Sequence, residues 1–580
     1  MNHLSGLDAA FLYVETPETP MHVGGLNIFE LPPGYEGEFL DNLRTHIAQR
    51  MHLAPVFQRK LVNMPFELAN PIWVADEDLD LEYHIRSTVL PKPGNRAQLD
   101  KLVGRLHSSL LDRSRPLWEF YVIEGIETPV DAPPGTRHVA FYSKVHHAAV
   151  DGEAGVALAH AIMDLSATPR AVRPAPQRRT SMGADTYGIA ELTTAGLKNS
   201  VVQTIKLAKT LPTLARSVYQ MLRPAKVETD GDSTSVASPE KAPTTWFGPR
   251  TPINVSITNQ RVFSSLSIPL AEIKHISKGN GVTLNDVVLA ICSGALRRYL
   301  RDLNCVPTMP LLAAVPVSLR ESGNTEMNTQ ASMMRISLAS TIDDPIERLK
   351  AIRASSAAAK ATTASMKSVL PTDFPSLGAP WLISGMASLF GRSKLANKMP
   401  PVANVAISNV PGPKVALYMA GAKMLTYFPV SIAVHSMALN VTVQSYNGAL
   451  DFGLIACRKA MPDLPVLADY MQRAHRELLK LTPMPIAAAS APAAPVPQAA
   501  TLAAPTASKA PKAPRKPARK PAAKAAAPPP APAPRKPKPP RRPLWHPWPW
   551  WPLQPLRPAK PGHPVHAKAP DGATSKTLSI

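Results

Sequence analysis

The last part of the chain most strongly limits what this sequence can fold into. Residues 483–580 hold 27 of the 64 prolines, and Ala and Lys make up much of the rest. Such a composition cannot bury enough apolar surface to offset the entropy of ordering, so we expect a disordered tail with polyproline II character. The whole chain of 580 residues is long enough for two or three domains, and we expect its compact part within residues 1–482.

The positive charge of the protein is concentrated in this tail. Of the formal net charge of +22, residues 483–580 carry +15 and the remaining 482 residues carry +7. Distributed positive charge attracts both nucleic acid and anionic membranes, and the tail could also serve only solubility. Four of the eight tryptophans lie in the tail and favour a lipid surface, where indole rings partition well: Trp545, Trp548, Trp550 and Trp551.

Strands that alternate with helices indicate an α/β protein. We expect a first half over residues 1–165, a linker with basic amphipathic helices over 166–245, a second half over 246–482 and the tail over 483–580. In the linker, the helices could pack on the body as a crossover or lie on a membrane surface. In the second half, "ALNVTVQSYNGALDFGLIA" predicts a hairpin that turns at Asn447–Gly448.

Cysteine content and segment hydropathy bear on the compartment. The three cysteines lack metal-ligand spacing, which favours a reducing compartment. The N-terminus has no basic region of the kind that begins a signal peptide, and no apolar run reaches the roughly 18–20 residues that span a bilayer. We therefore expect a cytoplasmic protein that associates peripherally with the inner membrane or with lipid inclusions.

The stretch "KVHHAAVDGEAG", residues 144–155, joins a predicted strand to a predicted helix. A neutral imidazole is available as a base near neutral pH, so His147 could take a proton from an alcohol or thiol that attacks an acyl carbon. His146 should point elsewhere and orient the loop. Asp151 could cap the helix or bind an arginine, with Arg320 as one candidate, and Gly152 would permit close backbone approach.

Less specific interpretations of these residues also exist. Adjacent histidines and an aspartate can form a polar turn whose hydrogen bonds are satisfied locally. A metal site is disfavoured because the spacing fits no common ligand motif. Asn285 and Asp286 can orient a reacting acyl group, or they can simply begin a helix. We expect Trp118 to be a packing residue.

The motif H-H-x-x-x-D-G resembles the fingerprint of the CoA-dependent acyltransferase superfamily. Other segments are similar, in the same order, to the bacterial wax ester synthase/acyl-CoA:diacylglycerol acyltransferases, and the resemblance covers residues 4 to about 480. These segments are "LSGLDAAFLYVETPETPMHVGGLNIF" from Leu4, "SRPLWEFYVIEGI" from Ser114, "TLNDVVLAICSGALRRYL" from Thr283, "PVSLR" from Pro316, "DDPIERL" from Asp343, "SNVPGP" from Ser408 and "SYNGAL" from Ser445.

The resemblance implies two chloramphenicol-acetyltransferase-like halves with a tunnel between them. It implies an O-acyltransferase of lipid and triacylglycerol biosynthesis that moves a long-chain acyl group from acyl-CoA to diacylglycerol or a fatty alcohol. In that reading His147 is the general base, His146, Asp151 and Gly152 shape its loop, and Asn285 and Asp286 bind or orient substrate. No cofactor or metal is expected, since acyl-CoA is the co-substrate.

A second function belongs to a different class. The same fold could persist as an inactive protein that binds nucleic acid or membrane through its basic tail. The intact histidine motif argues against this alternative. The sequence leaves the choice between diacylglycerol and alcohol acceptors open.

Overall fold

A computed structural model describes residues 4–64, 70–129, 132–150, 152–174, 247–318, 331–366 and 380–483. All of them belong to one compact unit, Met1–Pro492. The expected amphipathic linker helices and the proline-rich tail lie outside the described residues. Within these ranges, no helix is both long and apolar enough to cross a membrane.

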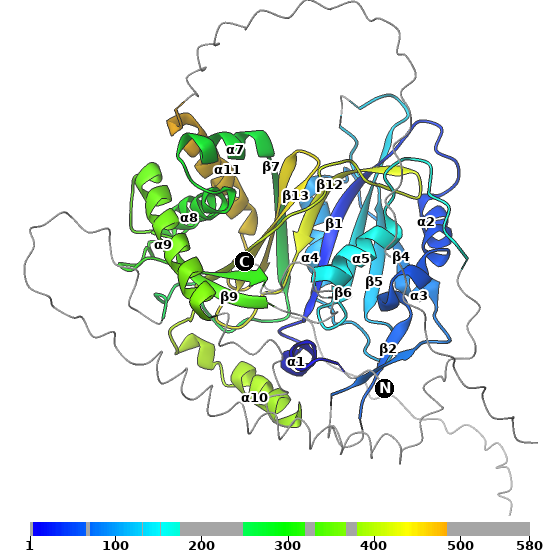
Figure 1. Ribbon diagram of the computed structural model, residues 1–580, viewed down its shortest axis with the longest axis horizontal. Coiled ribbons are helices and arrows are strands. Elements are labelled where there is room, and N and C mark those ends of the chain that lie inside the picture. Colours follow the sequence, from blue (N-terminus) through cyan, green and yellow to red (C-terminus); the bar gives the residue numbers. More distant parts are fainter. Residues whose placement is uncertain are drawn as a thin grey trace, which may run out of the picture. The chain divides into compact units, whose positions relative to one another are not determined.

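The first of two large sheets has the strand order β11-β12-β1-β6-β5-β4 (Figure 1). Its strands are antiparallel except for the parallel pair β4–β5. A separate two-stranded ribbon pairs β2 (Arg59–Val62) with β3 (Ile72–Ala75). The strands of the first sheet are β1 (His22–Leu31), β4 (Ile85–Val89), β5 (Trp118–Glu124), β6 (Arg137–His146), β11 (Tyr418–Met419) and β12 (Ala422–Val430).

The second sheet has the order β7-β14-β13-β10-β8-β9. Its three central strands run parallel as β13, β10 and β8, and its remaining pairs are antiparallel. Its strands are β7 (Arg261–Pro269), β8 (Leu312–Ser318), β9 (Ala331–Ser337), β10 (Val405–Val410), β13 (Leu439–Tyr446) and β14 (Ala449–Cys457). The predicted hairpin joins β13 to β14, and Asn447 and Gly448 have φ of 41° and 90°, as such a turn requires.

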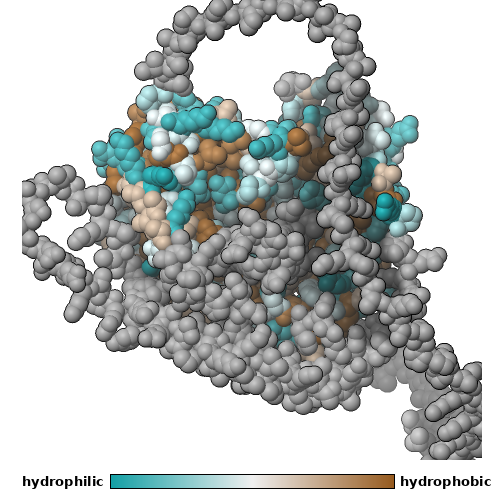
Figure 2. Space-filling model, in the orientation of Figure 1, coloured by the Kyte–Doolittle hydropathy of each residue, from teal (hydrophilic) through white to brown (hydrophobic). Residues whose placement is uncertain are grey.

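Helices pack on both sheets, and each sheet has its own apolar cores beneath its helices. Helices α2 (Phe39–Ala48) and α5 (Gly152–Ile162) pack on one face of the first sheet, and α4 (Arg96–His107) packs on the other. Helices α7 (Leu270–Gly279), α8 (Leu284–Asp302), α9 (Pro345–Met366) and α11 (Leu464–Leu481) share the core of the second sheet. The remaining helices are α1 (Gly6–Val14), the short α3 (Leu81–His84) and α10 (Pro380–Arg392). Hydrophilic and hydrophobic residues alternate over the face that carries α7 and α11 (Figure 2).

The two halves exchange structure, which the sequence did not indicate. β11 and β12 come from the second half of the chain, yet they complete the sheet of the first half through the pairing of β12 with β1. The proposed boundary near residue 246 therefore separates the chain into segments but not into self-contained sheets. On the other side, α4 packs against β7, and Ser108 Oγ accepts a hydrogen bond from the amide of Arg261 at 3.0 Å.

The sheets meet most closely where β14 passes β12. A Cβ atom added at Gly453 would lie 1.6 Å from the carbonyl oxygen of Pro429, so only glycine permits this approach. Next to it, the buried carboxylate of Asp451 accepts hydrogen bonds from the Tyr427 amide at 2.7 Å and from Ser267 Oγ at 2.6 Å. One side chain thus binds a strand of each sheet.

We predict that Gly453→Ala lowers the free energy of unfolding, because the new methyl group forces the two backbones apart. Overpacking of this kind costs about 1–3 kcal/mol. The control is Gly155→Ala in α5, where an added Cβ meets nothing within 4 Å and alanine is the better helix former by up to ~1 kcal/mol. Urea denaturation should show a lower midpoint for the first variant only, and equal midpoints would contradict the steric argument.

Candidate active site

The paired histidines lie where β6 ends and the chain turns toward α5 (Figure 1). The His146 amide donates to the carbonyl of Leu117 at 2.9 Å, and the His147 amide donates to the carbonyl of Met21 at 2.8 Å. Two different neighbouring segments therefore fix the backbone at consecutive residues. His146 is fully buried, whereas the His147 side chain is partly exposed.

The ring of His146 is held at both nitrogens. Nδ1 accepts a hydrogen bond from the amide of Ala148 at 3.0 Å, so the proton lies on Nε2, which is 3.2 Å from Oε2 of Glu15. These contacts tie the start of the turn to the end of α1. These contacts support the expected orienting role of His146. Both ring nitrogens are already occupied by hydrogen bonds within the protein.

Glu15 is the residue that sequence reasoning missed. Its side chain is 3% exposed, and Oε1 lies 2.8 Å from Nη2 of Arg113 while Oε2 accepts from the amide of Met21 at 2.9 Å. Burial alone would raise the pKa of this carboxyl, but the hydrogen bond and charge of His146, the charge of Arg113 and the Met21 amide lower it to about 2. Glu15 lies within a segment that resembles the family, and no spacing rule connects it to a histidine 131 residues away.

His147 has an aromatic ring against one face. The Phe11 ring, on α1, stacks on the imidazole with 3.9 Å between ring centroids and an angle of 17° between their planes. The stack covers one face of the imidazole, and the amide of the same residue is fixed by its hydrogen bond to the carbonyl of Met21. Helix α1 thus contacts both histidines, one through Phe11 and the other through the residue that follows the helix, Glu15.

Two further histidines, His22 and His107, lie buried beneath this turn. His22 is paired with His146 in the β1–β6 register, and its Nε2 donates to the carbonyl of His107 at 2.8 Å. Nε2 of His107 donates to the carbonyl of Ser431 at 2.8 Å, and Nδ1 accepts from Tyr142 Oη at 2.8 Å. Burial lowers the pKa of His107 to about 3 and that of His22 well below its ordinary value, so both stay neutral. Because Ser431 follows β12, this network also connects the two halves.

A buried ion pair supports the same strand. Lys144 has no exposed side-chain area, and its Nζ lies 2.8 Å from Oε2 of Glu119, the residue opposite it on β5. Burial lowers the pKa of Lys144, and the Glu119 carboxylate opposes that shift. Trp118 is packed as expected: it is 1% exposed, stacks on His84 at 4.3 Å and donates from Nε1 to the carbonyl of Phe57 at 3.3 Å.

Asn285 and Asp286 lie in the first turn of α8, in the second half of the chain. Asp286 is fully buried and forms a capping box: its Oδ2 accepts from the amide and the hydroxyl of Thr283 at 2.9 and 2.7 Å. Arg353 lies 3.5 Å from the same oxygen. Asp286 therefore fixes the start of α8, as the simpler interpretation held, while its Oδ1 is buried without a hydrogen-bond partner among the described residues. The Asn285 side chain is partly exposed.

Two predicted contributors cannot be placed. Asp151 and its candidate partner Arg320 lie outside the described residues, so their pairing stays a prediction. Gly152 is the first residue of α5. Among the residues that the structure describes, no group of three His, Cys, Asp or Glu side chains could hold a metal ion. All three cysteines are free.

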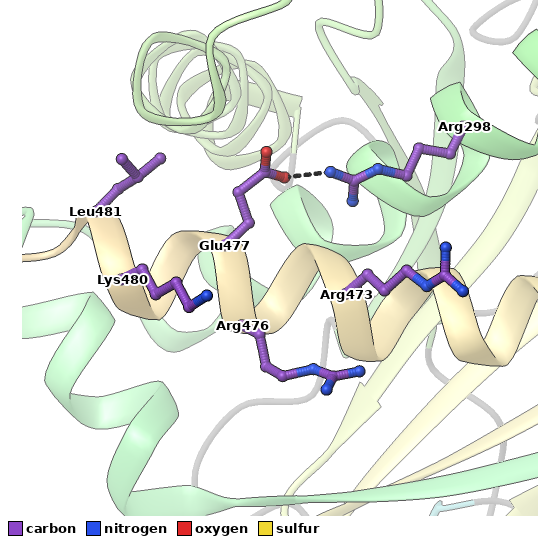
Figure 3. A pocket seen from close by; sticks show the side chains of 6 residues that line it. All are labelled: Arg298, Arg473, Arg476, Glu477, Lys480 and Leu481. Carbon is purple, nitrogen blue, oxygen red and sulfur yellow. Dashed lines mark hydrogen bonds and ion pairs between the residues drawn. The ribbon is translucent and has the colours of Figure 1, made fainter.

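A hollow of about 680 Å³ lies between α8 and α11 in the second half (Figure 3). It contains none of the predicted site residues, and the carboxylate that lines it, Glu477, is paired with Arg298. Arg298 of α8 points across it to Glu477 of α11, with 2.6 Å between Nη2 and Oε2. The other side chains that line it come from α11: Arg473, Arg476, Lys480 and Leu481.

Comparison with known proteins gives matches along most of the described chain. The model of the wax ester synthase/diacylglycerol acyltransferase catalytic domain matches residues 4–288, and that of the C-terminal domain of the same family matches residues 328–479. A putative diacylglycerol O-acyltransferase of Mycobacterium tuberculosis strain H37Rv is 36% identical over 479 residues, which are 82% of this chain and 99% of that protein. The chain belongs to the wax ester synthase/diacylglycerol acyltransferase family.

Other members of this family confirm the fold. A probable diacylglycerol O-acyltransferase of the same Mycobacterium tuberculosis strain is 34% identical over 480 residues, covering 81% of this chain and 97% of the relative. The solved wax ester synthase/diacylglycerol acyltransferase of Marinobacter aquaeolei VT8 superposes with a TM-score of 0.58 at 30% identity, covering 82% of this chain and 98% of that one. The predicted family, the two-halved α/β fold and the assignment as an acyltransferase enzyme are confirmed. The tunnel between the halves stays a prediction.

We predict that Glu15→Gln destabilises the protein at neutral pH by about 3 kcal/mol, the value of a pKa lowered from 4.5 to about 2. Because the folded-state pKa is lowered, this stabilisation is fully present above pH 4.5 and is lost as the pH falls toward 2. The stability curves of variant and wild type should therefore converge over that interval in chemical denaturation.

The control for this experiment is Glu36→Gln, which removes an exposed carboxylate close in sequence. Its stability curve should follow that of the wild type at every pH. A constant offset between Glu15→Gln and wild type from pH 7 to pH 2 would mean that the carboxylate charge does not stabilise the turn.

Proposed function

We propose that this protein transfers a long-chain acyl group from acyl-CoA to the hydroxyl of diacylglycerol or of a long-chain alcohol, with His147 as general base. The family membership supports an acyl-CoA-dependent O-acyltransferase, and the names of its relatives include both diacylglycerol acyltransferases and a wax ester synthase. The observation that carries the assignment of the base is the fixed turn, in which His146 is committed to Glu15 while His147 is stacked on Phe11.

The chemistry requires one base and no covalent intermediate on the enzyme. A ring nitrogen of His147 takes the acceptor proton as the acceptor oxygen bonds to the thioester carbonyl carbon. The carbon–sulfur bond then breaks, and the proton passes from the imidazolium to the sulfur of the leaving CoA. No cofactor is needed, since acyl-CoA supplies the activated acyl group.

The buried carboxylate beside the turn is already paired at both oxygens. Oε1 of Glu15 lies 2.8 Å from Nη2 of Arg113, and Oε2 lies 3.2 Å from Nε2 of His146. Asn285 is the candidate for orienting the acyl carbonyl from the second half, and Asp151 and Gly152 complete the loop.

A catalytically inactive scaffold is the competing function. It would need no precise placement of His147, and a buried, charge-paired Glu15 beneath the turn would add only stability. The family membership and the retained H-H-x-x-x-D-G motif favour the enzyme. The basic tail remains available for a lipid or nucleic-acid surface in either case.

We predict that His147→Ala reduces turnover by about 10²–10⁴-fold, the usual contribution of a general base, while the melting temperature falls only by the loss of the stack on Phe11. His146→Ala should lower both, because it removes the partner of the buried Glu15 carboxylate. Purified variants would be assayed with labelled palmitoyl-CoA and with each acceptor offered separately. Near-wild-type turnover of His147→Ala with every acceptor would refute the assignment of the base.

We also predict a sequential mechanism, because direct attack requires acyl-CoA and acceptor to be bound together. Initial rates at varied concentrations of both substrates should give intersecting lines in double-reciprocal plots. Parallel lines, or an acylated residue found by mass spectrometry after incubation with acyl-CoA alone, would indicate a covalent intermediate and another nucleophile.

A further inference from the structure

The segment from Leu389 to Val402 exposes several large apolar side chains to solvent. We call its exposed residues, together with the adjacent Phe247 and Arg250, the 389–402 surface. Phe247 belongs to it because the amide of the next residue, Gly248, donates to the carbonyl of Pro401 at 2.7 Å. A cluster of this kind marks an interaction site more often than a random surface. Its apolar members are Leu389 (68% exposed), Leu395 (40%), Met399 (45%), Val402 (61%) and Phe247 (44%).

Hydrogen bonds hold this surface in place. The short helix η5 (Leu395–Asn397) is followed by a turn in which the amide of Met399 donates to the carbonyl of Leu395 at 3.1 Å. The Asn397 side chain accepts from the amide of Ser256 at 2.6 Å, and this contact attaches the segment to the body of the second half. The apolar side chains are therefore presented by a folded segment.

The surface is also positively charged. Arg392, Lys394 and Lys398 are all exposed within the segment, and the exposed Arg250 donates a hydrogen bond to the carbonyl of Asn397. The sequence contains no Asp or Glu at all between Asp373 and Asp451. The three cations at positions 392, 394 and 398 therefore have no acidic partner from their own stretch of chain.

The position of the surface connects it to the active site. Helix α10, which leads into the segment, packs against α1 (Figure 1). Helix α1 carries Phe11, whose ring stacks on His147. Helix α1 therefore lies between the proposed base and α10, which carries Leu389 and Arg392 of the 389–402 surface.

We propose that the 389–402 surface docks the enzyme on an anionic lipid surface. Apolar side chains insert at the boundary of the acyl chains while Lys and Arg contact lipid phosphates, a combination typical of proteins that lie on membranes. A second copy of the chain fits less well, because a twofold contact through this surface would place like charges opposite each other. The purpose of the docking rests on the proposed function, since a diacylglycerol or fatty alcohol acceptor would be dissolved in that lipid.

The first test measures binding of the full-length protein to vesicles, with no acyl-CoA present. Vesicles of phosphatidylcholine alone are compared with vesicles that also contain phosphatidylglycerol. Lys394→Gln/Lys398→Gln should lower the partition coefficient on the mixed vesicles by up to roughly 30-fold at low salt, given the contribution of each lysine near an anionic surface. The matched control is Lys274→Gln/Lys278→Gln on α7, which removes the same charge from two exposed lysines elsewhere and leaves the tail intact.

The second test separates apolar insertion from charge. Met399→Ser/Val402→Ser should remove binding that persists at high salt, because burial of apolar area is not screened. Leu303→Ser/Val306→Ser is its control, since these residues are also exposed, at 42% and 39%, but lie beyond α8. Equal losses in surface and control variants in either test would overturn the proposal. Surface variants that bind vesicles like the wild type but lose a dimer in ultracentrifugation would also overturn it, in favour of self-association.

The acyl-transfer reaction is measured separately on the same variants. With acyl-CoA and a water-soluble short-chain alcohol, all of them should turn over like the wild type, because no residue of the proposed active site is changed. Loss of turnover by the surface variants alone with this soluble acceptor would contradict a docking role. If the wild type itself shows no turnover with any acceptor, the proposed function fails, while the vesicle comparison still decides whether the surface binds lipid.

Discussion

The close passage of β14 beneath β12 is the contact on which the rest of the structure depends. β12 hydrogen-bonds to β1 in one sheet while Gly453 of the other sheet lies directly against the Pro429 carbonyl. Asp451 then receives hydrogen bonds from both β12 and β7. Burial raises the pKa of this carboxyl, so two polar contacts are needed to compensate for its removal from water. The two halves cannot separate without breaking a strand pairing and exposing this group.

The contact between β12 and β14 also helps to hold the histidine turn in place. His107 links α4 to the chain just after β12 through the Ser431 carbonyl, and His22 links β1 to the end of α4. Both rings are neutral and buried, so they contribute hydrogen bonds and packing but no charge. Among the described residues, the buried carboxylate that contacts the turn is Glu15, and its charge is matched by Arg113. The proposed base, His147, thus lies beside groups whose hydrogen bonds are already formed, which is a form of preorganisation.

Adjacent histidines have different environments because the strand ends between them. His146 continues the alternation of β6 and shares the buried face of His22, whereas His147 lies in the turn and is stacked on Phe11. The N-terminal helix supplies a contact to each of them. The same helix packs against α10, so the N-terminal helix lies between the turn and the element that precedes the exposed apolar and basic surface. This order suits an enzyme that acts on acceptors dissolved in lipid.

Local sequence determined much of this protein. The strand that ends at the paired histidines and the Asn447–Gly448 turn are each encoded within a few residues, and both were predicted correctly because short-range sterics and hydrogen bonds decide them. The capping box at Thr283 is equally local, and it agrees with the interpretation of Asn285 and Asp286 as the start of a helix. The histidine motif and the segments around it likewise identified the family. Only the tertiary structure decided which residues support the turn. Glu15 and His146 are 131 residues apart, and β12 joins the sheet of the opposite half. Asp286 accepts hydrogen bonds from Thr283 and so caps a helix. These outcomes depend on which distant segments share a buried volume, and no local pattern of residues specifies that.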